Sequence, residues 1–146
     1  MLLTDEYFMR IALQQAQLAF EADEIPVGAI IVANNTIIAK AHNQVEQLQD
    51  VTAHAEILAM TAASSYLGSK YLKDCTLYVS LEPCTMCGGA IYWGQLGRLV
   101  FGAWDEKRGC ESLNLKALHP KTQVKGGVLG GESSQMIRLF FEQKRL

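Results

Sequence analysis

The chain has 146 residues, which is long enough for one domain with its own hydrophobic core. Hydrophobic residues make up 49% and charged residues 19%, a composition that excludes an intrinsically disordered chain and an integral membrane protein. The net charge of −2 hides an asymmetry, because residues 1–97 hold 4 Lys or Arg and 10 Asp or Glu, whereas residues 98–146 hold 9 and 5. The basic C-terminal third arises either by chance or from a surface that binds a polyanion.

The sequence contains no recognisable targeting or anchoring segment. The N-terminal stretch MLLTDEYFMR lacks a basic region followed by an apolar one, and the longest apolar run, VGAIIVA at 27–33, is far shorter than a bilayer span. The four cysteines are too few and too unevenly spaced for a disulfide scaffold. We therefore expect a single cytoplasmic domain over residues 1–146, with no membrane contact.

The first half of the chain predicts a helix, a hairpin and a second helix. Thr4 precedes two acids and an apolar stripe at helical spacing, which predicts a capped helix over 5–22. Two β-branched runs at 27–33 and 36–42, joined by Asn34-Asn35, predict a β-hairpin. The polar segment 43–51 predicts a loop that leads into a helix at about 53–64.

The second half of the chain alternates strands with helices. The predicted elements are a strand at 76–80, a helix at 84–95 with Pro83 in its first turn, a strand at 97–103, a loop at 104–121, a strand within 121–128 and a helix at 132–145. Such alternation predicts a layered α/β domain with a partly parallel sheet.

Two cysteines lie one helical turn apart in the segment PCTMC (83–87). Unpaired N–H groups at a helix start favour the thiolate form, and two thiolates at this spacing can bind one zinc ion. The motif alone is ambiguous, since redox enzymes and structural zinc sites also use it. A structural site needs two more protein ligands, but the sequence has no second close cysteine pair and no histidine pair. The best third ligand is His54, and three protein ligands with a water in the fourth position are typical of a catalytic zinc site.

Glu56 follows His54 by two residues in the segment TAHAEILAM (52–60). It is the candidate proton acceptor, which would form hydroxide from the water and later return the proton. Residues i and i+2 of a helix point about 200° apart, so the two side chains can converge only beyond the helix N-terminus. We therefore expect His54 in the first turn and two helix N-termini facing one metal ion. Taken alone, His54 would more often be a structural histidine, and Glu56 an acid that complements the helix dipole.

The joint pattern H-x-E, followed about thirty residues later by P-C-x-x-C, is the signature of zinc-dependent nucleobase deaminases. The chain resembles the cytidine deaminase superfamily and, within it, the bacterial tRNA-specific adenosine deaminases. The resemblance covers nearly the whole chain, through EIPVGAIIV (24–32), AHN (41–43), DVTAHAEILAM (50–60), TLYVSLEPCTMCGGAIYWGQLGRLVFGA (76–103) and LFFEQKR (139–145).

The resemblance implies a three-layer α/β/α sandwich of the cytidine deaminase type with a mixed sheet, one zinc ion per subunit and a homodimer. His54, Cys84 and Cys87 would bind the zinc, and Glu56 would be the proton shuttle. The implied reaction is hydrolytic deamination of the wobble adenosine of a tRNA anticodon to inosine, with zinc-bound hydroxide as the nucleophile. The anticodon stem-loop would be the partner, and the cost of unstacking the target base would be small because the loop already presents unpaired bases. The implied substrate-binding residues are Asn43, Pro26, Val27 and Ala55.

By the same resemblance, the RNA would lie beside one loop and the C-terminal helix. The implied RNA contacts are Asp105, Lys107, Arg108, Phe141, Lys144 and Arg145. Phe141 could equally be a core residue. Three positions depart from the family's common pattern, with Val51 in place of proline, Gly88 in place of alanine and Trp104 in place of arginine. Trp104 could stack on a base or be buried in a dimer contact, and the sequence leaves both roles open.

Two other functions remain open from the sequence. A small-molecule deaminase of the same superfamily could act on free guanine, cytosine or a nucleotide, and GAIYW (89–93) is also similar to guanine deaminases. The segment IPVGA (25–29) and the basic C-terminal third favour a large polyanionic substrate instead. A non-catalytic zinc or redox module built on Cys84 and Cys87 would leave Glu56 without a catalytic role.

Overall fold

The computed structural model describes residues 2–145, so Met1 and Leu146, the two ends of the expected domain, lie outside the described residues. Five strands form one mixed sheet in the order β2-β1-β3-β4-β5. β1 (Gly28–Ala33) pairs antiparallel with β2 (Thr36–His42) and β3 (Cys75–Leu81). β4 (Arg98–Ala103) pairs parallel with β3 and with β5 (Gln123–Lys125). The predicted partly parallel sheet is confirmed.

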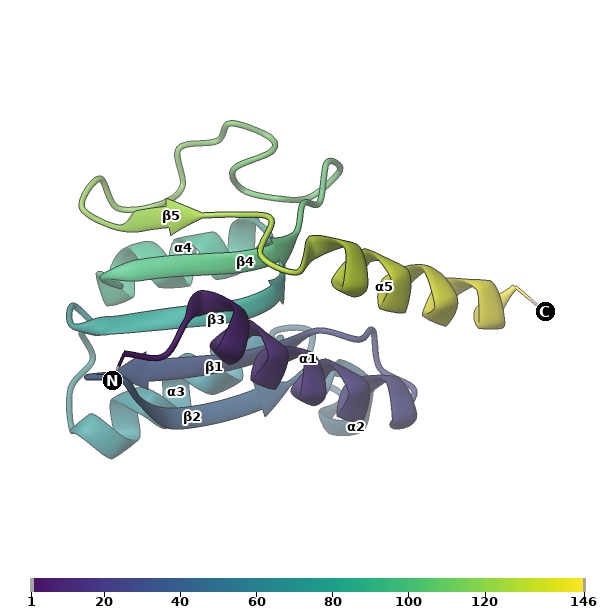
Figure 1. The fold of residues 1–146 in the computed structure, drawn as a ribbon, viewed down its shortest axis with the longest axis horizontal. Helices are drawn as coiled ribbons and strands as arrows, with labels where there is room; N and C mark the ends of the chain where they lie inside the picture. The colour runs from purple at the N-terminus through teal and green to yellow at the C-terminus, as the bar shows by residue number, and fades with distance from the viewer. Residues whose placement is uncertain (1, 146) are drawn as a thin grey trace.

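Helices cover both faces of the sheet. Figure 1 shows α1 (Asp5–Glu21) and α5 (Gly130–Lys144) in front of it, and α3 (Ala55–Leu67) and α4 (Thr85–Gly94) behind it. This arrangement confirms the expected three-layer α/β/α sandwich. Within residues 2–145, no helix combines the length and the apolar character that crossing a membrane requires.

α1 packs closely on β1 because its contact residues are small or apolar. The Thr4 side chain accepts a hydrogen bond from the Tyr7 N–H at 3.1 Å, which satisfies one free donor at the helix start. Phe8, in the first turns, is buried against the sheet. A Cβ on Gly28 would lie 2.0 Å from the carbonyl oxygen of Ala12, so glycine is required where the helix crosses the strand.

On the other face of the sheet, a hydrophobic core fills the space between the strands and the helices α3 and α4. It includes Ala59 of α3, Ile91 of α4 and Phe101 of β4, all with no exposed surface. Burying a large apolar side chain contributes about 1.5–3 kcal/mol. α4 follows β3 directly, so its N-terminus lies at the carboxyl end of a strand that pairs parallel with its neighbour. Ligands of α/β sheets commonly bind at this edge.

The predicted hairpin and the second predicted helix are confirmed with small shifts. Asn34 and Asn35 have φ of 50° and 60°, the left-handed conformation that a tight hairpin turn requires. The helix predicted at 53–64 begins at Ala55 and ends at Leu67, where Gly68 adopts a φ of 64°.

The prediction that 43–51 is entirely a loop is wrong, because this segment contains α2 (Val45–Leu48). The buried carboxylate of Glu24 accepts hydrogen bonds from the N–H groups of Glu46 and Gln47, at 3.1 and 2.8 Å. A helix of one turn is marginal alone, and this distant acceptor satisfies its free donors.

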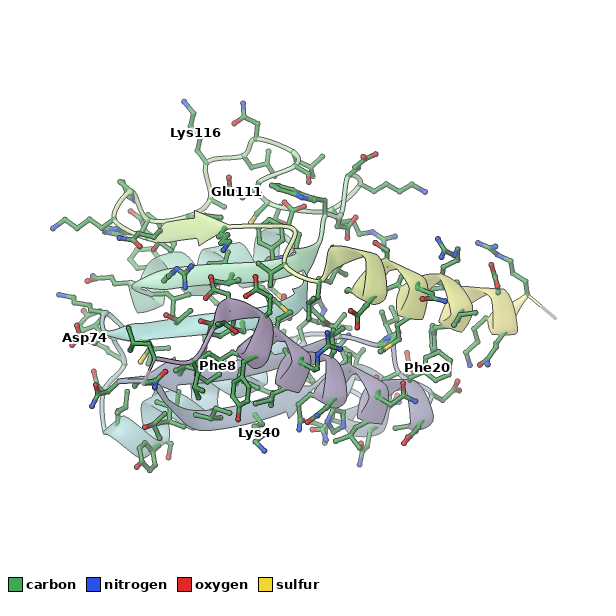
Figure 2. The ribbon with its side chains drawn as sticks, in the orientation of Figure 1. Phe8, Phe20, Lys40, Asp74, Glu111 and Lys116 are labelled. Atoms are coloured by element: carbon green, nitrogen blue, oxygen red, sulfur yellow. The ribbon has the colours of Figure 1, made fainter. Side chains whose placement is uncertain are left out.

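Two further details of the second half differ from the prediction. Pro83 lies before the helix rather than in its first turn, because Cys84, the N-cap of α4, has extended backbone angles. The strand expected within 121–128 has three residues, Gln123–Lys125. The long connection at 104–121 is a loop as predicted, and Lys116 lies at its outer edge (Figure 2).

Candidate active site

α3 and α4 each begin with a residue of the predicted site. His54 is the N-cap of α3, with φ −74° and ψ 152°, and Cys84 is the N-cap of α4, with φ −72° and ψ 178°. N-cap side chains usually accept hydrogen bonds from the first turn, but neither of these does. Asn43 takes this role for α3, because its Oδ1 accepts a hydrogen bond from the Ala55 N–H at 2.8 Å. The imidazole and the thiol thus remain available for other contacts.

His54, Cys84 and Cys87 lie together at these two helix starts. Nδ1 of His54 is 3.7 Å from Sγ of Cys84 and 3.5 Å from Sγ of Cys87. The three potential ligand atoms lie within 4.8 Å of one another, and the described residues contain no other such group of three. Two sulfurs and one imidazole nitrogen are a donor set typical of zinc with a position left for water. The residues therefore fit a single zinc ion.

The pKa values of the two thiols shift in opposite directions. The pKa of Cys84 is lowered, because its sulfur accepts a hydrogen bond from Cys87 and interacts with His54. The pKa of Cys87 is raised by the same hydrogen bond and by burial. Bonding to Cys84 raises the pKa of His54. One thiolate is favoured already, and a bound cation would favour the second.

Glu56 lies in the first turn of α3, outside the group of three ligand candidates. Its residue is 4% exposed, and burial raises the pKa of the carboxyl to about 7. A carboxyl with a pKa near neutrality can both accept and return a proton. His54 is the N-cap and Glu56 is the second residue of the helix, and both side chains line the same cleft.

A cleft of about 1470 Å³ opens on this site, and His54, Glu56 and Cys84 belong to its lining. Pockets for small molecules usually measure about 300–1,000 Å³, so the cleft has room for more than a free base. The predicted substrate and RNA contacts that line it are Asn43, Val27, Asp105, Lys107, Arg108, Phe141 and Lys144. Pro26 and Ala55 are buried but are not part of the lining. Arg145 is exposed at the end of α5 and is not part of the lining either.

Asn43 connects two walls of the cleft. It is 7% exposed, and its Nδ2 donates to the carbonyl oxygen of Ile25 at 3.0 Å while its Oδ1 binds the start of α3. Its backbone N–H donates to the carbonyl oxygen of Val27 at 3.1 Å. Asn43 therefore holds the segment 25–27 against α3, besides lining the cleft.

Glu82 is a buried carboxylate whose role the sequence analysis missed. It is 2% exposed, and it accepts hydrogen bonds from the N–H groups of Asp105 and Glu111 at 2.8 Å and of Ser112 at 2.6 Å, as well as from the Ser112 hydroxyl. It thus anchors the loop after β4 to the end of β3, two residues before Cys84. An acid in the otherwise apolar stretch LYVSLEPC (77–84) was the one available signal, because its partners are 23 to 30 residues away.

Two charged residues of the lining, Glu24 and Arg138, are among those that were not predicted from the sequence. Glu24 caps α2, as described above. Arg138 is exposed on α5 and adds a positive charge to the wall that contains Lys144. A lone basic residue on an exposed helix face gives no signal in the sequence.

The chain is similar to known deaminases in sequence and in structure. A model of the MafB19-like deaminase family matches residues 3–145. The tRNA-specific adenosine deaminase of Agrobacterium fabrum (strain C58) is 41% identical over 145 residues, which are 96% of this chain and 95% of that protein. A solved structure from a study of A-to-I editing by tRNA:A34 deaminases at the wobble position superposes with a TM-score of 0.84 at 41% identity, over 89% of this chain and 98% of that chain.

A guanine deaminase from Nitrosomonas europaea has a similar structure but a more distant sequence. It superposes with a TM-score of 0.80 at 26% identity, over 96% of this chain and 86% of that chain. The structural neighbours confirm the cytidine deaminase-like fold, and the sequence identity is higher with the tRNA deaminases than with this guanine deaminase. The chain therefore belongs to the family of tRNA-specific adenosine deaminases.

Proposed function

We propose that the protein hydrolyses the wobble adenosine of a tRNA anticodon to inosine, with release of ammonia. The observation that carries the proposal is one cleft that joins Glu56 and the His54, Cys84 and Cys87 cluster to the loop 104–108 and to α5. The cleft is large and its α5 wall is basic, as an anticodon loop requires. The activity of the relatives supports the same assignment.

His54, Cys84 and Cys87 would hold one zinc ion per subunit, and a zinc ion supplies positive charge that acidifies a water molecule. Glu56 would take the proton from this water as its oxygen attacks the carbon that carries the amino group. The same carboxyl would pass this proton to the adjacent ring nitrogen, and would then take the proton of the newly attached hydroxyl and give it to the amine, which would leave as ammonia. Its burial beside the ligand cluster keeps bulk water from competing for these protons.

The proposed reaction also indicates which residues contact the nucleoside and where the protein acts. Asn43 would contact the target nucleoside, and the segment 25–27 would form a wall beside it, because both meet at the start of α3. Residues 1–146 would constitute one deaminase domain, which the family match over 3–145 supports. A tRNA substrate also supports the expected cytoplasmic location.

A direct test compares macromolecular and free substrates. The zinc-loaded protein is incubated with an anticodon stem-loop that carries adenosine at the wobble position, and separately with guanine, cytosine and adenosine. We expect inosine in the digested stem-loop and no ammonia from the free compounds; a loop with guanosine at the wobble position is the control. Ammonia release from guanine without inosine in the RNA would favour the small-molecule deaminase instead.

We also expect a homodimer that forms through α4. Trp93 is 77% exposed on this helix, and it lines a groove between α3 and α4 with Met60 and Ile57. An exposed tryptophan beside an apolar groove is typical of an interface. Sedimentation of the wild-type protein should give twice the mass of one chain, and Trp93→Glu should give the mass of a monomer. A wild-type monomer at micromolar concentration would contradict the expectation.

A further inference from the structure

Trp104 lies on the cleft directly after β4. Its residue is 54% exposed, and its indole meets the ring of Phe101 edge-to-face, with the ring centroids 4.7 Å apart at 89°. Phe101 itself is fully buried. The indole is therefore supported by the core at one side, while about half of the residue's surface is exposed and the residue lines the cleft.

The position of the indole is fixed by its surroundings. The N–H of the next residue, Asp105, donates to the buried Glu82 at 2.8 Å, which anchors the backbone. A Cβ on Gly126 would lie 2.7 Å from the indole and 2.5 Å from the Phe101 ring, so this glycine leaves room for both rings. A rigid, accessible aromatic ring loses little conformational freedom when a ligand stacks on it.

The location of Trp104 separates it from the expected dimer surface. Trp104 shares its cleft with Glu56 and Cys84. Trp93, the other tryptophan of the chain, lines the groove between α3 and α4, and Trp104 does not. The accessible indole is thus placed for the substrate of the cleft rather than for a partner bound at α4.

We propose that Trp104 is the stacking platform for a base that flanks the target adenosine. The proposal rests on the proposed function, because it needs a single-stranded RNA in the cleft. When one base of a loop enters a pocket, its neighbours lose a stacking partner, and an aromatic side chain beside the pocket replaces it. Trp104 would then contribute to RNA affinity and leave the chemistry at Glu56 unchanged.

The test measures binding of the anticodon stem-loop to zinc-loaded Glu56→Ala protein, in which the RNA is not turned over. The chain has two tryptophans, so the intrinsic fluorescence that remains after the emission of Trp93 is subtracted reports on Trp104. We expect RNA to quench the fluorescence, and Trp104→Phe in the same background to remove most of the quenching. Trp104→Ala should weaken binding about tenfold, whereas Trp104→Phe, which retains an aromatic face, should stay within about threefold.

Tyr66→Ala is the matched control, because Tyr66 is 72% exposed and is not part of the cleft lining. Stem-loops with an abasic nucleotide on either side of the wobble adenosine then locate the contact. The loop that lacks the stacked base should abolish both the quenching by RNA and the penalty of Trp104→Ala. Unchanged affinity of Trp104→Ala, or a penalty that is the same with every abasic loop, would overturn the proposal.

Fluorescence quenching and inosine formation distinguish the remaining outcomes. If Trp104→Ala does not fold, quenching of the unmodified Trp104 by normal and abasic loops still decides whether it stacks. Failure of the proposed function has a different signature, since the wild-type protein would then form no inosine in the same stem-loop. Inosine formation without a stacking contact overturns only the role of Trp104.

Discussion

His54 and Glu56 are two residues apart, yet the helix start gives them different surroundings. His54, at the N-cap, lies beyond the helical backbone and beside the two sulfurs. Glu56, inside the first turn, is buried and lines the cleft. Because Asn43 binds the free N–H of Ala55, the imidazole is not needed as a cap. One segment thus supplies both a ligand candidate and a separate candidate for the proton acceptor.

This separation predicts different metal contents for two neighbouring variants. His54→Ala and Cys87→Ser each remove one of three ligands, and we expect both to lose most of the zinc after dialysis. Glu56→Ala should retain about one zinc ion per chain. Elemental analysis provides the measurement, and Cys75→Ala, which removes a buried cysteine outside the cluster, is the control. Loss of zinc from Glu56→Ala to the same extent as from His54→Ala would contradict this assignment.

One carboxylate attaches α1 to three strands. Asp5, in the first turn of α1, binds both terminal nitrogens of Arg98 on β4 at 2.8 Å and Nζ of Lys125 on β5 at 3.1 Å. It also accepts a hydrogen bond from the hydroxyl of Tyr78 on β3 at 2.8 Å. The hydrogen bonds to Arg98 hold the pKa of Asp5 well below its ordinary value.

A lowered folded-state pKa means that Asp5 stabilises the fold when it is ionised. This contribution is complete above the unfolded pKa of about 4, and it is lost as the pH falls below that value. We expect Asp5→Asn to lower the free energy of unfolding by about 1.5–3 kcal/mol at pH 7. The difference from wild type should shrink at lower pH. Urea denaturation at pH 7 and at the lower pH measures the free energy of unfolding, and the exposed Glu6→Gln is the control. If the difference between Asp5→Asn and wild type were the same at both pH values, the role of the ionised Asp5 would be contradicted.

The position of the loop after β4 depends on hydrogen bonds that its backbone N–H groups donate to the carboxylate of Glu82. Glu82→Gln keeps the size of the side chain but replaces one acceptor oxygen with a donor that faces backbone N–H groups. We expect the KM for the stem-loop to rise about tenfold, with zinc content retained and kcat less affected. Gly109→Ala should act similarly, because its Cβ would lie 2.1 Å from the Glu82 carboxyl carbon.

Glu111→Gln is the matched control for this experiment. Glu111 lies on the same loop (Figure 2), and its backbone N–H, not its side chain, binds Glu82. Steady-state kinetics with the stem-loop provide the measurement. A lower kcat with an unchanged KM for Glu82→Gln would show that Glu82 does not act by positioning the loop.

The charge asymmetry of the sequence is reflected in the lining of the cleft. The acidic half of the chain contributes Asp23, Glu24 and Glu46 to the lining, and the basic third contributes Arg138 and Lys144. Lys107 and Arg108 also line the cleft, but Asp105 and Glu106 of the same loop balance their charge, and Lys144 forms an ion pair with Asp23. A polyanion would therefore be drawn toward α5, while the acidic wall disfavours phosphate.

The features that could be predicted from the sequence are those determined by interactions between residues close together in the chain. The turn at Asn34-Asn35, the helix starts near His54 and Cys84 and the layered architecture all follow from patterns within a few residues. Sequence reasoning failed for α2 and for the role of Glu82, because each depends on hydrogen bonds between residues at least 22 positions apart. Which of Lys144 and Arg145 lines the cleft depends on where α5 ends, and no pattern of side chains specifies that end to one residue.

The most direct test of the account compares inosine formation by wild-type and Glu56→Gln protein at equal zinc content. The substrate is an anticodon stem-loop with adenosine at the wobble position, and the product is measured after digestion to nucleosides. We expect the wild-type protein to convert the adenosine, and Glu56→Gln to be slower by about a hundredfold or more, because it cannot transfer the proton. Comparable rates for the two proteins, or no inosine from the wild-type protein, would contradict the account.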